Sequence, residues 1–446
     1  MCILFSGDDM ESIWKKNAQM PPFPSLDGDL KTDVLIVGGG LTGLLCAYKL
    51  KQEGVRCTLL EADRVCGGIT ANTTAKITSQ HGLIYSQLLR KYGREPARVY
   101  WETQEMALRE FRKLAGEILC DFQDTSHTVY ASEDISALTE EAEALRTLEI
   151  PFVYTNSLPL PVPVKGAVRF ADQAQFHPLK FAAGISKGLD IYEQTSVREF
   201  RKGTVVTDRG RIRAEKIIVA THFPILNKHG GYFLKLYQER SYVLSVENAA
   251  DVHGMYLAAE KQGFSFRNYG TQLLIGSGGH RTGKRSNGWR DLEIFAQEQY
   301  PDRSVVARWA NQDCMTLDGM PYIGRYSRGT PDLYVATGFN KWGMTNAMAA
   351  AMVLTDLLQG KEASYASLFS PDRSVLHSQL AVNFMESAVH LIKPSRPRCP
   401  HLGCALNWNP QERSWDCPCH GSRFDREGKL LDNPATGDLP EQGSGI

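Results

Sequence analysis

The stretch that decides the fold is Asp33-Val-Leu-Ile-Val37-Gly38-Gly-Gly40-Leu-Thr-Gly43, near the start of this 446-residue chain. Its first five residues are mostly apolar, as expected for a buried parallel strand. Apolar residues at helical spacing follow, at Leu44, Ala47 and Leu50. The order of strand, glycine-rich turn and helix predicts the opening unit of a Rossmann-like α/β fold that binds a dinucleotide.

The glycine spacing explains how this unit would hold a dinucleotide. Gly38 permits a tight turn, Gly40 lets the backbone approach a pyrophosphate, and Gly43 allows the helix to pack closely on the strand. The helix N-terminus then faces the phosphate charge. A second predicted strand, residues 56–60, is followed by Glu61, where an acid takes the ribose hydroxyls of either NAD or FAD. The predicted contact residues of this unit are Gly38, Gly40, Leu41, Thr42, Gly43, Glu61 and Ala62.

A second motif lies near the carboxyl end of the chain. It reads Cys399-Pro-His401, then fifteen residues, then Cys417-Pro-Cys419-His420. Two thiolates and two imidazoles are the donor set of a Rieske 2Fe–2S cluster, in which cysteines hold one iron and histidines hold the other. Mixed cysteine and histidine ligands also suit Zn²⁺, so a structural zinc site is the alternative.

This motif resembles that of the Rieske proteins of respiratory and photosynthetic chains. The resemblance implies that Cys399 and Cys417 bind one iron, that His401 and His420 bind the other, and that Cys404 and Cys419 form a disulfide. It also implies that Ser422 donates to a bridging sulfur, whereas Phe424 replaces a tyrosine that would donate to a cysteine sulfur. Because hydrogen bonds to the sulfurs stabilise the reduced cluster, we expect a lower potential than in the respiratory proteins.

The chain has little room for the strands that normally precede the first ligand loop. Residues 394–398 lead almost directly from a helix-like stretch into Cys399. We therefore expect a shortened cluster module of strands and loops whose ligand loops lean on the preceding domain or on a partner.

Three further segments indicate which dinucleotide is bound. They are residues 66–74, 195–221 and 318–345, and together with the first unit they resemble the D-amino-acid oxidase and glycine oxidase superfamily over residues 31–360. The resemblance implies FAD, with the last strand and helix returning to close on the flavin ring. The additional cofactor contacts that it implies are Thr70, Thr73, Thr74, Val197, Thr221, Gly338, Gly343, Met344 and Thr345.

The predicted fold class is α/β, with a Rossmann-like FAD-binding domain and an α+β substrate domain that contains an antiparallel sheet. The FAD-binding domain is expected to be discontinuous, over residues 1–80, 165–225 and 310–365. The substrate domain is expected at 81–164 and 226–309, a linker at 366–396, and the Rieske module at 397–446. The glycines of 276–283 read as a turn after a strand at 273–275, so we expect electrons from an organic substrate and not from NAD(P)H.

One departure from the family bears on the substrate. Amino-acid oxidases of this kind often carry an arginine before the Asp-Gly-x-Pro turn that grips the substrate carboxylate. Asp313 stands at that position here, which favours a cationic substrate such as an amine. The alternative is a structural acid paired with Arg267, Arg281 or a backbone amide. Lys341 and Trp342 are expected beside the flavin, and with Asp313 they are the candidate catalytic residues.

Composition limits the remaining functions. The 50 basic and 50 acidic residues balance, so nothing suggests nucleic acid or an anionic membrane as a partner. No stretch resembles a membrane span or a secretory signal, and we expect a cytoplasmic protein without membrane insertion.

The expected partners are a small-molecule substrate and a one-electron carrier protein. The main hypothesis is thus an FAD-dependent oxidoreductase that acts on C–N bonds and exchanges electrons with a Rieske cluster; the alternatives are a redox sensor without turnover and a flavin oxidase with a zinc-binding tail.

Overall fold

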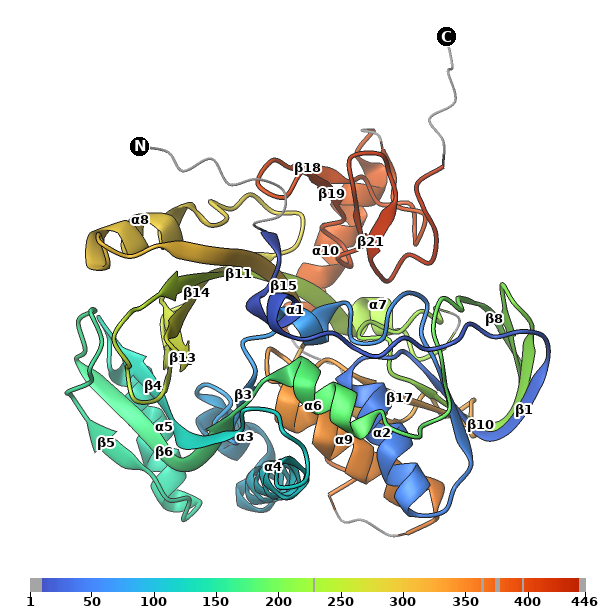
Figure 1. Cartoon of the computed structure of the whole chain (residues 1–446), viewed down its shortest axis with the longest axis horizontal. Coiled ribbons are helices and arrows are strands. Elements are labelled where there is room, and N and C mark those ends of the chain that lie inside the picture. The colour runs from blue at the N-terminus through green and yellow to red at the C-terminus, as the bar shows by residue number, and fades with distance from the viewer. Residues whose placement is uncertain (1–9, 228, 362–364, 374–377, 395–396, 441–446) are drawn as a thin grey trace.

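The structure is a computed structural model, and it describes residues 10–227, 229–361, 365–373, 378–394 and 397–440 (Figure 1). Three sheets organise these residues. Two large sheets form the body of the molecule, and a small third sheet lies at its top beside α10 (Ser378–Ile392).

The first sheet contains the dinucleotide-binding unit that the sequence predicts. Its strand order is β16-β17-β10-β1-β2-β7, and β8 and β9 extend it from β10. The central strand β1 runs parallel to both β2 and β10, and β10 runs parallel to β17. The carboxyl ends of these four strands therefore meet at one edge, where open α/β sheets bind ligands. The strands are β1 (Leu30–Val37), β2 (Cys57–Leu60), β7 (Ile191–Tyr192), β8 (Val197–Arg201), β9 (Thr204–Thr207), β10 (Arg211–Val219), β16 (Tyr322–Arg325) and β17 (Leu333–Thr337).

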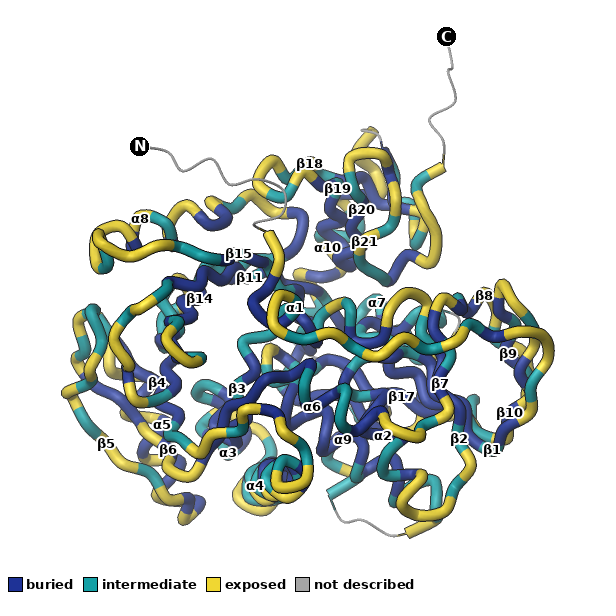
Figure 2. Tube along the Cα trace, in the orientation of Figure 1, coloured by how far each residue is buried: buried dark blue, intermediate teal, exposed yellow. Residues whose placement is uncertain are grey.

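Two helices pack against each other beneath this sheet. They are α2 (Leu41–Gln52), which follows the glycine-rich turn, and α9 (Gly343–Leu358), which follows β17. Most of α9 is buried (Figure 2), as expected for a helix that is apolar on nearly every side. The other helices are α1 (Ile13–Asn17), α3 (Ile84–Tyr92), α4 (Arg94–Ala115), α5 (Ser136–Thr147), α6 (Pro178–Ile185), α7 (Tyr232–Lys235), α8 (Arg290–Gln299) and the short 3₁₀ helix η2 (Ile69–Asn72).

The second sheet has nine strands in the order β15-β11-β14-β13-β12-β4-β6-β3, with β5 paired to β6. It is antiparallel apart from the parallel pair β12 and β4. The strands are β3 (Lys76–Ile77), β4 (Gln123–Ala131), β5 (Val153–Thr155), β6 (Gly166–Gln175), β11 (Leu236–Glu247), β12 (Met255–Ala258), β13 (Ser265–Tyr269), β14 (Gln272–Arg281) and β15 (Val305–Thr316).

Two sequence-based expectations need correction in this sheet. Strand β6 lies in the segment 165–225 that was expected in the FAD-binding domain, yet it pairs with β4 of the second sheet. The turn expected after residue 275 is also absent from the described chain, because β14 continues to Arg281 and pairs with β11. Strand pairing over long sequence separations decides both points.

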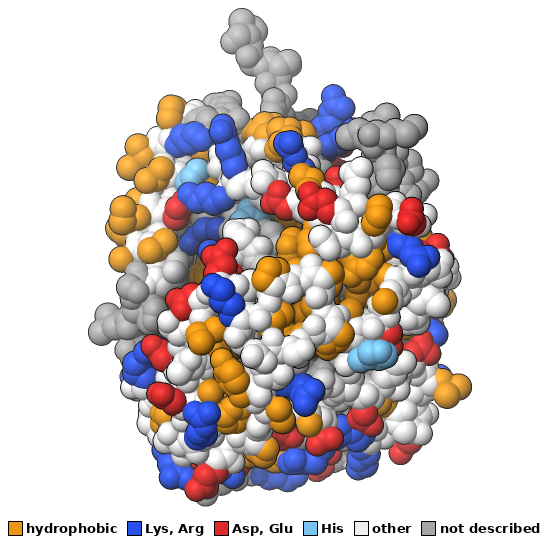
Figure 3. Space-filling view, turned by 90° about the vertical axis from the view of Figure 1, so that its left-hand side faces the viewer, with side chains coloured by type: hydrophobic (Ala, Val, Ile, Leu, Met, Phe, Trp, Pro, Cys, Tyr) orange, Lys and Arg blue, Asp and Glu red, His pale blue; other side chains and the backbone are white. Residues whose placement is uncertain are grey.

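Helix α8 covers the second sheet on one side of the molecule. Phe295 of α8 stacks on Phe264 with ring centroids 4.2 Å apart, and Trp289 packs edge-on against Tyr242. Apolar side chains gather across the middle of this face of the molecule, with charged side chains above and below them (Figure 3).

The carboxy-terminal module rests on the second sheet, as expected for a shortened module that needs support. Its own sheet has the order β18-β19-β20-β21. Side chains of β11, β14 and β15 donate to backbone carbonyls of the second cysteine-containing loop: Gln238 to His420, Arg281 to Pro418 and Cys419, and Gln312 to Gly421. The strands are β18 (Asn407–Asn409), β19 (Ser414–Asp416), β20 (Arg423–Phe424) and β21 (Leu430–Asp432).

A buried group of charges fastens the module to the second sheet. The carboxylate of Glu412 lies between Arg240 of β11 and Arg423 of β20, and it accepts from Arg240 Nε at 3.0 Å and from Arg423 Nη2 at 2.8 Å. Arg423 also contacts Asp416 and Asp432 of the module. Burial alone would raise the pKa of Glu412, but the two guanidinium groups lower it to about 2. We call Arg240, Glu412 and Arg423 the module clamp.

The clamp predicts that Glu412→Gln loosens the module. The change leaves two buried guanidinium groups without their shared carboxylate, and removing one partner of a buried ion pair costs about 3–5 kcal/mol. Limited proteolysis should cut the carboxy-terminal module faster in Glu412→Gln than in the natural protein. Since the folded-state pKa of Glu412 is depressed, its stabilisation is complete above about pH 4.5 and is lost as the pH falls towards 2. The exposed Glu427→Gln is the matched control, and equal cleavage of the two variants would contradict the clamp.

Candidate flavin and iron-sulfur sites

The turn between β1 and α2 has room only for glycine at two of the predicted positions. Gly38 has a φ of 111°, and a Cβ there would lie 2.5 Å from the carbonyl oxygen of Ala220. A Cβ on Gly43 would lie 2.0 Å from the carbonyl oxygen of Gly38. Both positions therefore require glycine, the first for its backbone angle and the second for close packing of helix on strand.

Two helix N-termini open at the edge formed by the parallel strands. Helix α2 begins at Leu41, whose amide donates to Thr70 Oγ1 at 3.0 Å, and its N-cap residue Gly40 has no side chain that could bond the other amides of the first turn. Helix α9 begins at Gly343 after Trp342, also without a side-chain cap in the described chain. Amide groups that are left free at a helix start attract phosphate and other electron-rich groups. Thr42 lies in the first turn of α2, and Met344 and Thr345 lie in the first turn of α9.

Glu61 stands at the end of β2 with its carboxylate held by two backbone amides. Oε2 accepts from Gly39 at 2.7 Å and Oε1 accepts from Asp63 at 2.9 Å. Burial raises the pKa of Glu61. The carbonyl of Glu61 also accepts from the amide of Thr195, which places the start of β8, and with it Val197, near Glu61. Ala62 follows Glu61 in the same loop.

Three buried side chains from other parts of the chain donate hydrogen bonds to backbone carbonyls of the loop that contains Thr70, Thr73 and Thr74. Trp14 Nε1 donates to the carbonyl of Thr73 at 2.7 Å, and Arg267 Nη1 donates to the carbonyl of Thr74 at 2.8 Å. Trp309 Nε1 donates to the carbonyl of Asn72, which precedes Thr73 in the loop. These contacts fix the loop, and they also show that Arg267 is bound to backbone and not to Asp313.

A cavity of about 480 Å³ lies beside the start of α9. Trp342 lines it and stacks on His81, with ring centroids 5.0 Å apart and an interplanar angle of 11°. His81 Nε2 is 2.9 Å from Thr345 Oγ1, so two predicted residues of the α9 loop share one buried partner. The lining residues are His81, Leu83, Ile84, Gln87, Leu88, Arg90, Lys91, Tyr92, Tyr237, Met315, Thr316, Leu317, Asp318, Gly319, Asn340 and Trp342.

Asp313, which is buried, and Lys341, whose side chain is 38% exposed, form a charged group near this cavity, and neither residue lines it. Lys341 Nζ pairs with Glu239 Oε2 at 2.9 Å, and Asp313 on the neighbouring strand accepts from Asn311 Nδ2 at 3.1 Å. Burial and the nearby carboxylate of Glu239 raise the pKa of Asp313 to about 6, although Lys341 opposes the shift. The structural alternative expected Arg267 or Arg281 as a partner of Asp313. Both bind backbone carbonyls instead.

Three basic residues near the cavity were missed by the sequence analysis, the partly buried Lys76 and the buried His81 and His127. Lys76 of β3 donates to the carbonyl of Tyr256 at 2.7 Å, and burial lowers its pKa to about 7. His127 of β4 packs edge-on against Trp342, and no described group bonds its Nε2. Only His81 had a signal in the sequence, which is its position shortly after the threonine-rich loop. Their burial depends on strand pairing, which the local sequence does not reveal.

The carboxy-terminal motif brings its sulfurs and imidazoles together. The sulfur of Cys417 lies with those of Cys404 and Cys419 within 4.8 Å of one another, and hydrogen bonds from the neighbouring thiols, that of Cys399 included, lower the pKa of Cys417. The rings of His401 and His420 lie 5.0 Å apart between centroids. Cys399 and His401 come from one loop, and Cys417 and His420 come from the other, so each loop supplies one thiol and one imidazole.

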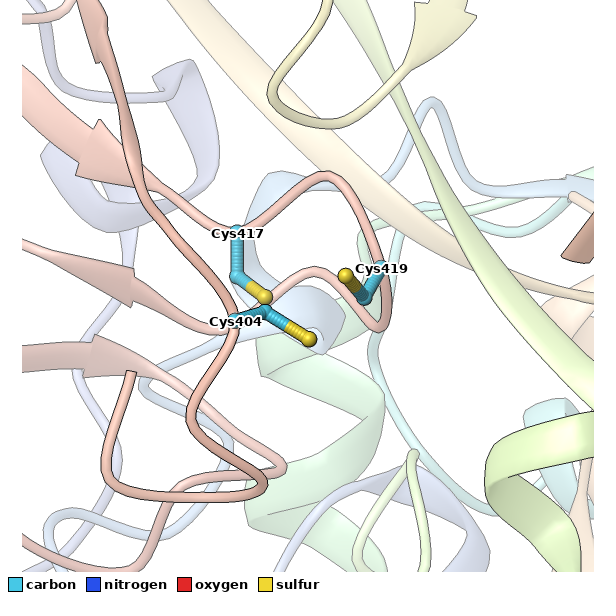
Figure 4. Close-up of side chains that lie close together, drawn as sticks. All are labelled: Cys404, Cys417 and Cys419. Atoms are coloured by element: carbon cyan, nitrogen blue, oxygen red, sulfur yellow. The ribbon is translucent and has the colours of Figure 1, made fainter. Parts of the chain in front are cut away.

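The expected disulfide between Cys404 and Cys419 is not formed in this structure. Both are free thiols, and their sulfurs lie with that of Cys417 within 4.8 Å of one another. Figure 4 shows the three side chains converging from the two loops. A disulfide requires a bond of about 2.05 Å between two sulfurs. Here Cys417 also approaches both thiols, so the three sulfurs form a cluster instead of a bonded pair.

The two histidines point into the protein. His420 is 2% exposed, and the ring of Phe223 packs edge-on against both imidazoles with centroids 6.3 Å away. His401 Nε2 is hydrogen-bonded to Asn227 Oδ1 at 2.8 Å, while His401 Nδ1 and both ring nitrogens of His420 have no partner in the described chain. Buried imidazole nitrogens without partners, opposite a group of thiols, fit a site that holds a metal cluster.

The cluster loops connect to the flavin side through a continuous chain of amide groups. Gln238 Nε2 donates to the carbonyls of His420 and Asn433, both at 2.9 Å. Asn433 Nδ2 in turn donates to the carbonyl of Thr221, which follows β10 and is one of the predicted flavin contacts. Thr221 therefore lies at the junction of the two candidate sites, and Gly338 follows β17, the strand paired with β10.

Comparison with known families agrees with both sites. The family model "DAO: FAD dependent oxidoreductase" matches residues 33–357, and the model "Rieske [2Fe-2S] domain" matches residues 372–442. The chain belongs to the DAO family of FAD-dependent oxidoreductases. Its carboxy-terminal module is a Rieske domain, and the match to that family includes α10, which lies in the segment expected as a linker.

Individual relatives show how far the likeness extends. The "Putative Rieske 2Fe-2S iron-sulfur protein YhfW" of Bacillus subtilis is 33% identical and covers 97% of both chains. The gamma-glutamylputrescine oxidoreductase of Escherichia coli is 24% identical over 76% of this chain and 86% of its own length. The crystal structure of glycine oxidase from Geobacillus kaustophilus superposes with a TM-score of 0.66 and 21% identity, covering 78% of this chain and all of that one.

The two cofactors of this DAO-family oxidoreductase are FAD and a Rieske 2Fe–2S cluster. The glycine turn, the two helix starts and Glu61 would hold the FAD. The thiols of Cys399 and Cys417 and the imidazoles of His401 and His420 would hold the cluster. Ser422, whose hydroxyl accepts from the amide of Ala435 at 3.0 Å, and Phe424 are both buried beside these loops. Among the described helices, none combines the length and apolar character needed to cross a bilayer.

The contact between His401 and Asn227 predicts a tuning effect on the cluster. An acceptor on the second ring nitrogen makes an imidazole ligand more basic, which favours oxidised iron. Asn227→Leu should therefore raise the midpoint potential, and Asn227→Asp should lower it, in a redox titration followed by electron paramagnetic resonance. Asn407→Leu, which removes a side-chain hydrogen bond to Gly283 elsewhere on the module, is the control. Equal potentials in all three variants would show that Asn227 has no such role.

Proposed function

We propose that this flavoprotein oxidises a small amine, or an amino-acid-like substrate that presents a cation to Asp313, and exchanges electrons with a one-electron carrier. FAD bound in the cradle supplies hydride acceptance from the donor carbon, and the cluster supplies exchange of single electrons. The protein's own part is to bind and orient the substrate and to keep water from the site.

The observation that carries the substrate class is the buried carboxylate of Asp313. It takes the place of the arginine expected in amino-acid oxidases, and it lies beside the ion pair of Lys341 and Glu239. Two carboxylates and one ammonium leave this group with an excess of negative charge above the pKa of Asp313. A buried negative group attracts a cation and repels a carboxylate. Two of the relatives, a gamma-glutamylputrescine oxidoreductase and a glycine oxidase, support a nitrogen-containing substrate.

A substrate screen without oxygen tests this proposal. Amines, amino acids and hydroxy acids are added in turn, and bleaching of the flavin absorbance is followed together with the Rieske signal in electron paramagnetic resonance. We expect amines to bleach the flavin and reduce the cluster. Bleaching without a Rieske signal, combined with zinc and no iron or sulfide in the protein, would favour a structural metal in the tail.

Asp313 also predicts how substrate binding depends on pH. Its pKa of about 6 means that the carboxylate is ionised above pH 6 and protonated below it. The KM for a cationic amine should therefore fall as the pH rises from 5 to 7, since the amine stays protonated throughout. Asp313→Asn should remove this dependence and raise the KM at pH 7 about tenfold, because the cavity loses the attraction of a nearby negative charge that does not itself line it.

A neutral substrate and the exposed Asp27→Asn variant serve as controls for this measurement. The neutral substrate should show no pH-dependent change in KM across the same range, and Asp27→Asn should behave as the natural protein. If the natural protein and Asp313→Asn had the same KM for the cationic substrate, as they should for the neutral one, the role of Asp313 would be contradicted.

A further inference from the structure

Helix α10 has its polar residues inside and its apolar residues outside. Asn383 and His390 face the protein and are 2% and 6% exposed. Six apolar residues on the other sides of the helix are 45–81% exposed, and they are Val382, Phe384, Met385, Val389, Leu391 and Ile392. Contiguous apolar surface of this kind usually marks an interaction site.

This apolar face is adjacent to the cluster loops. The thiol of Cys419 donates to the carbonyl of Glu386 at 3.9 Å, and the amide of Ala405 donates to the carbonyl of His390 at 2.9 Å. Leu402, between His401 and Cys404 on the first ligand loop, is 38% exposed and extends the apolar surface onto the loop itself. A protein that covered α10 would therefore approach the cluster closely.

The opposite side of the cluster site is closed by the chain itself. Phe223 and Phe233 pack edge-on against His420, and Asn227 bonds His401. Since the rate of electron transfer falls steeply with distance, an external carrier must approach on another side. The side formed by α10 and Leu402 meets this requirement.

The charges around α10 indicate what kind of carrier fits. Three cationic residues, Lys284, Lys393 and Arg398, border the helix, whereas its one acid, Glu386, is paired with Lys284 at 2.7 Å. The border is therefore net positive. Helix α10 itself contains no lysine or arginine, unlike helices that lie on membrane surfaces with a cationic polar face. In a symmetric dimer the positive borders of the two copies would face and repel each other, so a second copy fits this surface less well than an acidic protein.

We propose that the exposed face of α10, with Leu402, is the docking surface for an acidic one-electron carrier protein. The proposal rests on the proposed function, because it names the partner of the same electron route. Small apolar contacts surrounded by complementary charge suit transient redox complexes, in which the charges speed the encounter.

The test replaces two outward residues with acids, as the double variant Met385→Glu/Val389→Glu. The probes are a small acidic 2Fe–2S ferredoxin and a flavodoxin, and the small-molecule probe is ferricyanide. We expect the KM for the protein carriers to rise at least about tenfold. Substrate-driven ferricyanide reduction and the Rieske spectrum should stay unchanged. Lys393→Glu should weaken the carrier interaction most at low salt. The control is Ile294→Glu on α8, a site 46% exposed and apolar like those on α10.

Several results would overturn the docking proposal. One is that neither acidic carrier is reduced or bound by the natural protein. Another is that the double variant and the natural protein have the same KM for the acidic carriers. A dimer in sedimentation that the double variant converts to monomers would assign the face to a second copy, and loss of binding to anionic vesicles would assign it to a membrane. Failure of ferricyanide reduction by the natural protein with every amine would instead count against the proposed function.

Discussion

The burial of one carboxylate, Glu412, between two guanidinium groups is the constraint on which the rest of the structure depends. It fastens the carboxy-terminal module, whose own apolar core is small, to the second sheet. Side chains of that sheet then bond backbone carbonyls of the second ligand loop, so the sheet holds in place a loop that also has internal backbone hydrogen bonds. The position of the iron-sulfur site relative to the flavin cradle follows from this docking.

The docking turns the histidine side of the cluster site inwards. Phe223 and Asn227 follow β10, and so does Thr221, one of the residues predicted to contact the flavin. Gln238 donates to the carbonyls of His420 and Asn433, and the side chain of Asn433 donates to the carbonyl of Thr221. The proposed flavin site and the second ligand loop are therefore connected through residues of one chain. The side left open, along α10, faces away from this connection.

The sequence predicts those features that a local constraint determines. Gly38 and Gly43 could be assigned because no other side chain fits there, and the two histidines and two cysteines because the cluster needs that donor set. The surroundings of Asp313 could not, because Glu239 and Lys341 reach it from distant parts of the chain. The same reason explains why β6 was assigned to the wrong sheet and why Asn227 was missed. The expected disulfide came from family resemblance, and here Cys417 lies close to both thiols.

Transfer of electrons within one chain is the central claim, and its dependence on protein concentration tests it most directly. An amine substrate is mixed with the oxidised protein without oxygen, and cluster reduction is followed by freeze-quench electron paramagnetic resonance at several dilutions. We expect a first-order rate that does not change with dilution, because flavin and cluster sites are joined in the same molecule. A rate that falls in proportion to protein concentration, or a flavin that bleaches while the cluster stays oxidised, would contradict the account.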